Sequence, residues 1–188
     1  MKLLLIDHND SFTYNIVEVL RHFTNCEITV TTYNNIDLNS IKNFDKIILS
    51  PGPGQPKDYP NTLKIIRDFY KTKPLLGICL GHQAICVEFG SDLYNMNDVT
   101  HGIDKEIKIT DSSKLFNAIP ENTTVGLYHS WAVDSKKLST KISITATTKD
   151  NTIMSVSHKD YPLFGIQFHP ESFLTTDGIK MLENFINL

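Results

Sequence analysis

Apolar residues in the first half of the chain follow two patterns that alternate along the sequence. Short apolar or alternating stretches predict β-strands, and most are followed by residues at the three-to-four spacing of a helix. The predicted strands are Lys2–Ile6, Glu27–Thr32, Lys46–Ser50 and Pro74–Ile78. The predicted helices are Phe12–Phe23, with Ser11 as candidate N-cap, Leu63–Tyr70 and Gly81–Phe89. This order indicates a mostly parallel sheet with helices on both faces.

The second half of the chain has short segments rich in Thr, Ile and Val, which are typical of antiparallel strands or hairpins. These segments are Ile107–Thr110, Thr123–Leu127, Lys141–Thr148 and Thr152–His158. Lys149–Asn151 is a turn candidate, Leu163–Phe168 resembles a buried strand, and Ile179–Ile186 suits a closing helix. With no repeat or linker to divide the chain, we expect residues 1–188 to form a single α/β domain whose sheet gains antiparallel strands late.

Composition narrows the class of protein. The 188 residues are 40% hydrophobic, which suits one globular domain and excludes collagen-like or highly charged disordered chains. The net charge of −3 favours neither a nucleic acid nor an anionic membrane as partner. No apolar run approaches the roughly 20 residues of a membrane span or the roughly 7 to 15 of a signal-peptide core. We therefore expect a cytoplasmic protein with no nucleic-acid or membrane partner.

Cys79 is the candidate nucleophile. It is one of three cysteines, an odd number without a C-x-x-C pair, which argues against a disulfide framework or a zinc site. The segment Gly77–Gly81, Gly-Ile-Cys-Leu-Gly, lies between a predicted strand and a predicted helix, as in a nucleophile elbow. Side chains two residues before and after the nucleophile would clash in so sharp a turn, and the helix N-terminus favours a thiolate. The alternative is a small buried core residue, which is how Cys26 and Cys86 are interpreted.

His169 and Glu171 are the candidate partners of that cysteine. His169 ends an apolar strand, and Pro170 keeps the segment extended, so that side chains two residues apart face the same way. A Cys79–His169–Glu171 triad is the preferred interpretation, with Glu171 orienting the imidazole. The alternative is a strand-end histidine beside a solvated glutamate. His82 is interpreted mainly as a packing residue, and His129 as either a substrate contact or a packing residue.

A rigid glycine-proline loop, Ser50–Gly54, follows another predicted strand. It matches neither a P-loop nor a dinucleotide fingerprint. Prolines stiffen the loop, and glycines let its backbone approach a ligand. Two strand-end loops can together form an oxyanion hole, and we assign its donors to the N–H groups of Gly52 and Leu80. The alternative is a tight structural turn.

Five segments in order resemble the class I, triad-type glutamine amidotransferases, and within them the glutaminase subunits of anthranilate synthase and aminodeoxychorismate synthase. The segments are Asp10–Asn15, Ser50–Gly54, Gly77–Gln83, Tyr128–Ser130 and Gln167–Ser172. The resemblance implies a flavodoxin-like α/β fold and assigns the triad to Cys79, His169 and Glu171. It further implies contacts to L-glutamine from Gly52, Pro53, Gly54, Gln83, Ser130 and Trp131.

The resemblance also implies a reaction and a partner. The reaction is hydrolysis of L-glutamine through a cysteine thioester, with no metal or organic cofactor. The implied partner is a chorismate-binding synthase subunit, joined in a hetero-oligomer, which uses the ammonia to make anthranilate or 4-amino-4-deoxychorismate. Three alternatives stay open: a glutaminase subunit of another synthase such as GMP synthase, a non-catalytic partner-binding subunit, and a free-standing cysteine hydrolase or peptidase.

Overall fold

A computed structural model describes residues 1–23, 26–111 and 113–188 of the chain. The strands are β1 (Lys2–Asp7), β2 (Glu27–Thr32), β3 (Lys46–Leu49), β4 (Leu75–Ile78), β5 (Leu93–Ile109), β6 (Asn122–Val133), β7 (Ile142–Thr148), β8 (Ile153–His158) and β9 (Leu163–Ile166). The α-helices are α1 (Thr13–Arg21), α2 (Pro60–Phe69), α3 (Leu80–Glu88) and α4 (Gly178–Ile186). Single 3-10 turns are η1 (Ser40–Asn43), η2 (Pro56–Asp58), η3 (Lys114–Phe116) and η4 (Ser135–Lys137). None of the helices in these ranges is long and apolar enough to cross a membrane.

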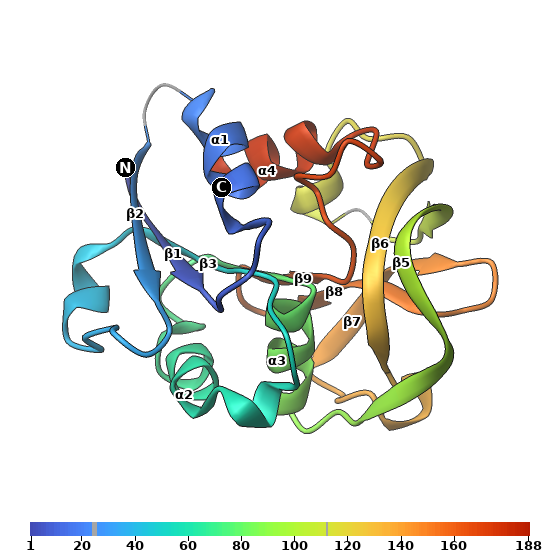
Figure 1. Ribbon diagram of the computed structural model, residues 1–188, viewed down its shortest axis with the longest axis horizontal. Coiled ribbons are helices and arrows are strands. Elements are labelled where there is room, and N and C mark those ends of the chain that lie inside the picture. Colours follow the sequence, from blue (N-terminus) through green and yellow to red (C-terminus); the bar gives the residue numbers. More distant parts are fainter. Residues whose placement is uncertain (24–25, 112) are drawn as a thin grey trace.

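Within the described ranges the strands form one nine-stranded sheet, in the order β2-β1-β3-β4-β9-β8-β7-β5-β6 (Figure 1). The pairings from β2 through β9 are parallel. Those from β9 through β6 are antiparallel, and all four added strands come from the second half of the chain. The predicted fold class, a mostly parallel α/β sheet with later antiparallel strands, is confirmed.

Helices cover both faces of the parallel half of this sheet, with α1 and α4 on one face and α2 and α3 on the other (Figure 1). Successive residues of β1 point to opposite faces, as strand geometry requires. Leu3 and Leu5 pack in the cluster that holds residues of α1 and α4, whereas Leu4 and Ile6 pack with residues of α2 and α3. The carboxyl ends of the parallel strands meet at one edge, where α/β proteins bind ligands.

The largest departure from prediction is the hairpin of β5 and β6. The sequence predicts only Ile107–Thr110 and Thr123–Leu127 as strands, but the ladder continues to the far ends of both elements, where Leu93 lies opposite Val133. Residues 101–106 of β5 are mostly exposed, so backbone pairing defines this strand and its apolar pattern is weak. Two register shifts within β5 interrupt the alternation further.

The predicted N-cap of the first helix is also wrong. Helix α1 begins at Thr13, its N-cap position is Phe12, and no side-chain cap is formed there. Two aspartates hold the turn instead. The carboxylate of Asp10 accepts a hydrogen bond from the Phe12 N–H at 2.8 Å, and that of Asp7 accepts one from the Thr13 hydroxyl at 2.7 Å. Ser11 is exposed and has no such contact.

Candidate active site

Cys79 occupies the sharp turn between β4 and α3. Its backbone has φ 50° and ψ −100°, a left-handed conformation that a residue with a side chain rarely adopts. The turn is held on both sides, because the Cys79 N–H donates to the carbonyl of Ile166 at 2.8 Å and the Cys79 carbonyl accepts from Gln83 N–H at 3.0 Å. Such strain at a strand–helix junction is typical of a functional residue held by its surroundings.

The two glycines of the elbow are required by close packing. A Cβ on Gly77 would lie 2.4 Å from the carbonyl group of Gly81, and a Cβ on Gly81 would lie 2.6 Å from the carbonyl oxygen of Leu49. Both distances are far below ordinary van der Waals contact. The steric prediction made from the Gly-x-Cys-x-Gly frame is confirmed.

His169 and Glu171 form a buried pair, as predicted, but the expected extended backbone is wrong: Pro170 and Glu171 lie in a turn, which the Ser172 N–H closes by donating to the His169 carbonyl at 3.2 Å. Nδ1 of His169 lies 2.7 Å from Oε1 of Glu171, and the two side chains are 2% and 0% exposed. The backbone of the segment is fixed to β6, since the His169 N–H donates to the Gly126 carbonyl at 3.1 Å and the Thr176 N–H donates to the Thr124 carbonyl at 3.0 Å. The imidazole therefore has one preferred orientation.

The environment of His169 favours a charged ring. Burial by itself lowers the pKa of His169, but its hydrogen bonds and charge interactions with Cys79 and Glu171 outweigh burial and raise the pKa to about 10. The second ring nitrogen, Nε2, is buried and makes no hydrogen bond of standard geometry among the described residues. The rings of Phe12 and Tyr128 flank the imidazole, with centroids 5.4 and 4.9 Å away. The charged imidazolium is therefore the form of His169 that these interactions support.

Cys79 opens onto a small pocket of about 180 Å³. Pockets for drug-sized ligands hold roughly 300–1,000 Å³, so this one suits a ligand the size of an amino acid. Every residue that the sequence assigned to glutamine contact or to the oxyanion hole lines it, whereas His169 and Glu171 are buried and do not line it. The lining residues are Gly52, Pro53, Gly54, Cys79, Leu80, Gln83, Tyr128, His129, Ser130 and Trp131.

The glycine-proline loop lies directly against the start of α3. A Cβ on Gly52 would be 2.7 Å from Cδ2 of Leu80 and 2.6 Å from Cβ of His8. Gly54 has a φ of +75°, which few residues other than glycine adopt. The loop is therefore packed against the elbow, and no larger residue fits at position 52.

Gln167 is a neighbour of the thiol that the sequence analysis did not single out. Its Nε2 donates to Sγ of Cys79 at 3.6 Å. Nε2 of Gln83 donates both to Oε1 of Gln167, at 3.1 Å, and to the carbonyl of Trp131, at 3.0 Å. The sequence carries no local signal for this contact, because it depends on β9 lying beside β4 and Gln167 follows the end of β9 in a bend.

The other two histidines of the region differ in their surroundings. His82 packs against Gly165, is fully buried, and neither ring nitrogen has a hydrogen-bond partner among the described residues. Burial, with a smaller contribution from the charge of His129, lowers the pKa of His82 to about 3. His129 lines the pocket, and its Nδ1 lies 2.9 Å from the Trp131 carbonyl. His82 is thus a packing residue, as expected, whereas His129 lines the pocket with its Nε2 buried and without a hydrogen-bond partner among the described residues.

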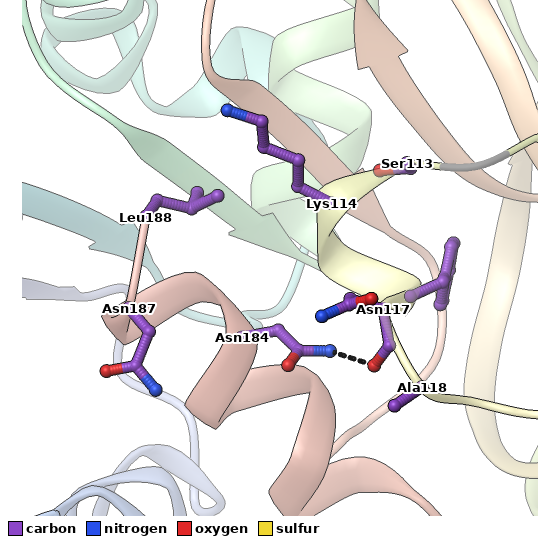
Figure 2. Close-up of a pocket in the computed structure, with 8 residues that line it drawn as sticks. Ser113, Lys114, Asn117, Ala118, Asn184, Asn187 and Leu188 are labelled. Carbon is purple, nitrogen blue, oxygen red and sulfur yellow. Dashed lines mark hydrogen bonds between the residues drawn. The ribbon is translucent and has the colours of Figure 1, made fainter.

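A larger cavity, of about 590 Å³, lies elsewhere, between η3 and the C-terminal end of α4 (Figure 2). In Figure 2 the amide of Asn184 points to the backbone carbonyl of Asn117, to which it donates at 2.8 Å. No Cys or His lines this cavity. The small pocket at Cys79 is the better candidate because it alone of the two contains a strained nucleophile. Among residues 1–23, 26–111 and 113–188, no three or more His, Cys, Asp or Glu side chains are grouped to hold a metal ion.

Comparison with known proteins agrees with this geometry. The family model for glutamine amidotransferase class I matches residues 4–188. Anthranilate synthase component 2 of Lactococcus lactis is 38% identical, over 98% of this chain and 93% of that protein. Aminodeoxychorismate/anthranilate synthase component 2 of Bacillus subtilis is 37% identical, over 98% of this chain and 95% of that protein. A crystal structure from Thermoplasma acidophilum, described as a GMP synthase subunit, superposes with a TM-score of 0.89 at 25% identity, over 100% of this chain and 92% of that one.

The chain belongs to the class I glutamine amidotransferases, as its five motifs indicate. Within this class, the relatives that it matches along nearly their whole length include second components of chorismate-aminating synthases.

Proposed function

We propose that this chain is the glutaminase subunit of a chorismate-aminating synthase, with Cys79 as nucleophile, His169 as acid and base, and Glu171 as the group that orients the imidazole. The observation that carries the proposal is the strained Cys79, whose pocket lies beside the buried His169–Glu171 pair. We further propose that residues 1–188 act as one domain in the cytoplasm, where a reduced thiol is maintained.

The first half of the proposed reaction forms a thioester. Sγ of Cys79 attacks the side-chain amide carbon of L-glutamine, and the amide oxygen becomes negatively charged. His169 donates its Nε2 proton to the leaving nitrogen, the carbon–nitrogen bond breaks, and ammonia departs. The raised pKa of His169 supports this role, since a ring that is charged before the attack has a proton to donate.

The second half regenerates the thiolate. The neutral His169 takes a proton from water, which attacks the thioester carbon, and the carbon–sulfur bond breaks to release glutamate. Both tetrahedral intermediates carry a negative oxygen, and the N–H groups of Gly52 and Leu80 are proposed to stabilise it. Their position supports this, because the two residues touch and both line the pocket.

Contacts to the amino-acid substrate are proposed for Gly52, Pro53, Gly54, Gln83, Ser130 and Trp131, all of which line the pocket. The hydrogen bonds of Gln83 support a second role, in which it holds the Trp131 carbonyl and the Gln167 side chain in place. The pocket's size suits L-glutamine and leaves no room for a second substrate such as chorismate.

Ammonia must therefore reach its acceptor on another subunit. The names of the Lactococcus and Bacillus relatives, second components of anthranilate and aminodeoxychorismate synthases, support a chorismate-binding first component as that partner. We propose that the pair forms a hetero-oligomer that makes anthranilate, 4-amino-4-deoxychorismate or both. A role in GMP synthesis is the second candidate, favoured by the structural similarity to the Thermoplasma protein.

The test is a Cys79→Ser chain combined with a chorismate-aminating first component. We expect loss of glutamine-dependent synthesis by several orders of magnitude, with ammonia-dependent synthesis unchanged, because the partner needs ammonia and not the thiol. Cys86→Ser is the matched control and keeps substantial activity, since Cys86 is buried in α3 away from the pocket. Glutaminase turnover near the wild-type rate in Cys79→Ser would reject the triad. Stimulation by a GMP-forming synthetase, but not by a chorismate enzyme, would reject the pathway.

A further inference from the structure

The peptide group that joins Pro51 to Gly52 is held by a hydrogen bond from the Ser50 side chain. The hydroxyl of Ser50 donates to the carbonyl oxygen of Pro51 at 2.6 Å. In a planar trans peptide the carbonyl and the following N–H point in opposite directions. A hydrogen bond that fixes the Pro51 carbonyl therefore also fixes the direction of the Gly52 N–H, on the other side of the same plane.

His8 in turn holds the Ser50 hydroxyl. Two contacts reach that oxygen: the backbone N–H of His8 at 2.9 Å and the ring nitrogen Nδ1 at 3.1 Å. The hydroxyl has a single proton, which goes to the Pro51 carbonyl, so both His8 groups must be donors. Nδ1 then carries the ring proton and Nε2 is an acceptor. Nε2 lies 2.8 Å from the hydroxyl of Thr62, which can supply the matching proton.

This chain of hydrogen bonds is closed to water. His8 and Ser50 are fully buried and Thr62 is 1% exposed. Burial lowers the pKa of His8 to about 4, against smaller opposing effects of the charge of Asp7 and of a hydrogen bond with the Ser50 backbone, so the ring is neutral near pH 7, as the donor–acceptor assignment requires. The rings of Tyr33 and Tyr59 pack on the imidazole, with centroids 6.0 and 5.0 Å away. The direct contact between Gly52 and Cβ of His8 leaves little freedom for the loop to shift.

We propose that His8 is a positioning residue for glutamine hydrolysis, acting through Ser50 and the Pro51 carbonyl to aim the Gly52 N–H at the oxyanion. The proposal rests on the function proposed above, because it presumes that Gly52 is an oxyanion donor. Ser50 sets the tautomer of His8, Thr62 matches it by donating to Nε2, and the proton at Nδ1 makes the chain of hydrogen bonds continuous.

The test compares a tetrahedral adduct with a ground-state ligand. In glutamate γ-semialdehyde an aldehyde replaces the amide, so the Cys79 thiol can add across its carbonyl to give a hemithioacetal whose oxygen lies in the oxyanion hole. Glutamate, the product, forms no such bond. In Ser50→Ala and His8→Phe, we expect kcat for glutamine to fall roughly 10- to 100-fold, less than the loss of a whole donor, with KM changed by less than about threefold. Affinity for the semialdehyde should fall by the same factor as kcat/KM, while affinity for glutamate stays near that of the wild type.

Two further variants separate positioning from folding. His8→Asn retains a side-chain N–H close to the place of Nδ1 and should recover most of the activity lost in His8→Phe. Ser91→Ala is the matched control, because Ser91 is also buried and also accepts a backbone N–H, from Ser139 at 3.1 Å, but at the far end of α3. In Ser91→Ala the free energy of unfolding should fall, while the ratio of the affinities for the semialdehyde and for glutamate stays that of the wild type. The double variant His8→Phe/Ser50→Ala should lose no more activity than the worse single variant, since both act on one peptide group.

The outcomes distinguish failure of the role proposed for His8 from failure of the proposed nucleophile. Equal weakening of semialdehyde and glutamate in Ser50→Ala, or an unchanged kcat in that variant, would overturn the role of His8 while leaving the triad intact. If the wild-type chain formed no hemithioacetal, or if Cys79→Ser bound the semialdehyde equally well, the proposed nucleophile itself would be wrong. If His8→Phe does not fold, Ser50→Ala still tests the proposal, because His8 acts through the Ser50 hydroxyl.

Discussion

Gly81→Ala is the substitution that most directly tests the contact between the elbow and the neighbouring strand. The new methyl group would lie 2.6 Å from the carbonyl oxygen of Leu49 and 2.7 Å from its Cβ, whereas ordinary contact begins at 3.4 Å. Relief of the closer contact requires a shift of 3.4 − 2.6 = 0.8 Å between the start of α3 and the end of β3. The oxygen belongs to the backbone of Leu49 and the new methyl group is attached directly to the backbone at position 81, so no side-chain rotation can relieve the contact.

The shift has a predictable effect on both stability and rate. Overpacking of this kind costs about 1–3 kcal/mol of unfolding free energy. The loop that carries Gly52 follows Leu49 directly, and Leu80 precedes Gly81, so the shift separates the two proposed oxyanion donors. An error of about 1 Å in such geometry can lower the rate about 100-fold. We therefore expect kcat/KM for glutamine to fall by a factor of roughly 30 to 100 in protein that is still folded.

The assay is glutaminase kinetics at a temperature where urea titration shows each variant to be folded. Gly90→Ala is the control. Gly90 has a φ of +89° with nothing within 4 Å of an added Cβ, so its substitution strains the backbone without displacing a neighbour. It should cost about 1 kcal/mol and leave kcat/KM unchanged. If Gly81→Ala keeps kcat/KM within about threefold of the wild type, the rate does not depend on the spacing of these two loops and the reasoning fails.

Three more outcomes are expected. Glu171→Gln should lower kcat less than His169→Ala does, because the carboxylate orients the imidazole and takes no proton; equal losses in steady-state kinetics would contradict that role. A glutamine-like electrophile should label Cys79 before Cys26 and Cys86, since burial raises the pKa of both other thiols, and peptide mapping after brief exposure would show the order. Folded-state pKa values of about 4 for His8 and about 3 for His82, against 6.5 when unfolded, mean that the unfolded chain binds more protons below pH 6.5. Unfolding free energy should therefore decrease as the pH is lowered, by about 2 kcal/mol per histidine at pH 5, and urea titrations of His82→Asn should show a flatter slope.

The elbow and the histidine–glutamate pair could be predicted because both depend on local geometry. Gly77 and Gly81 are needed wherever a strand turns into a helix within three residues. His169 and Glu171 are close in sequence and so meet locally, although they meet across a turn and not along the extended segment that was predicted. Neither inference requires knowledge of which strands are neighbours in the sheet.

Contacts that depend on the sheet could not be found in this way. Gln167 reaches Cys79 only because β9 lies next to β4, and that adjacency joins residues 88 apart in sequence. His8 likewise contacts Thr62, 54 residues away, only because the fold places the end of β1 beside α2. The exposed part of β5 was not predicted because main-chain pairing defines this strand, and such pairing imposes no apolar pattern on exposed side chains.

The segment that carries His169 and Glu171 also has a role at the border of the sheet. Strand β6 is last in the strand order, and the carbonyls of Thr124 and Gly126 on its outer side are already occupied by N–H groups of Thr176 and His169. An uncovered edge strand is a template on which another chain can pair and aggregate. Local opening of residues 169–176 would therefore both separate His169 from its fixed place beside Glu171 and uncover the carbonyls of Thr124 and Gly126 at the edge of the sheet.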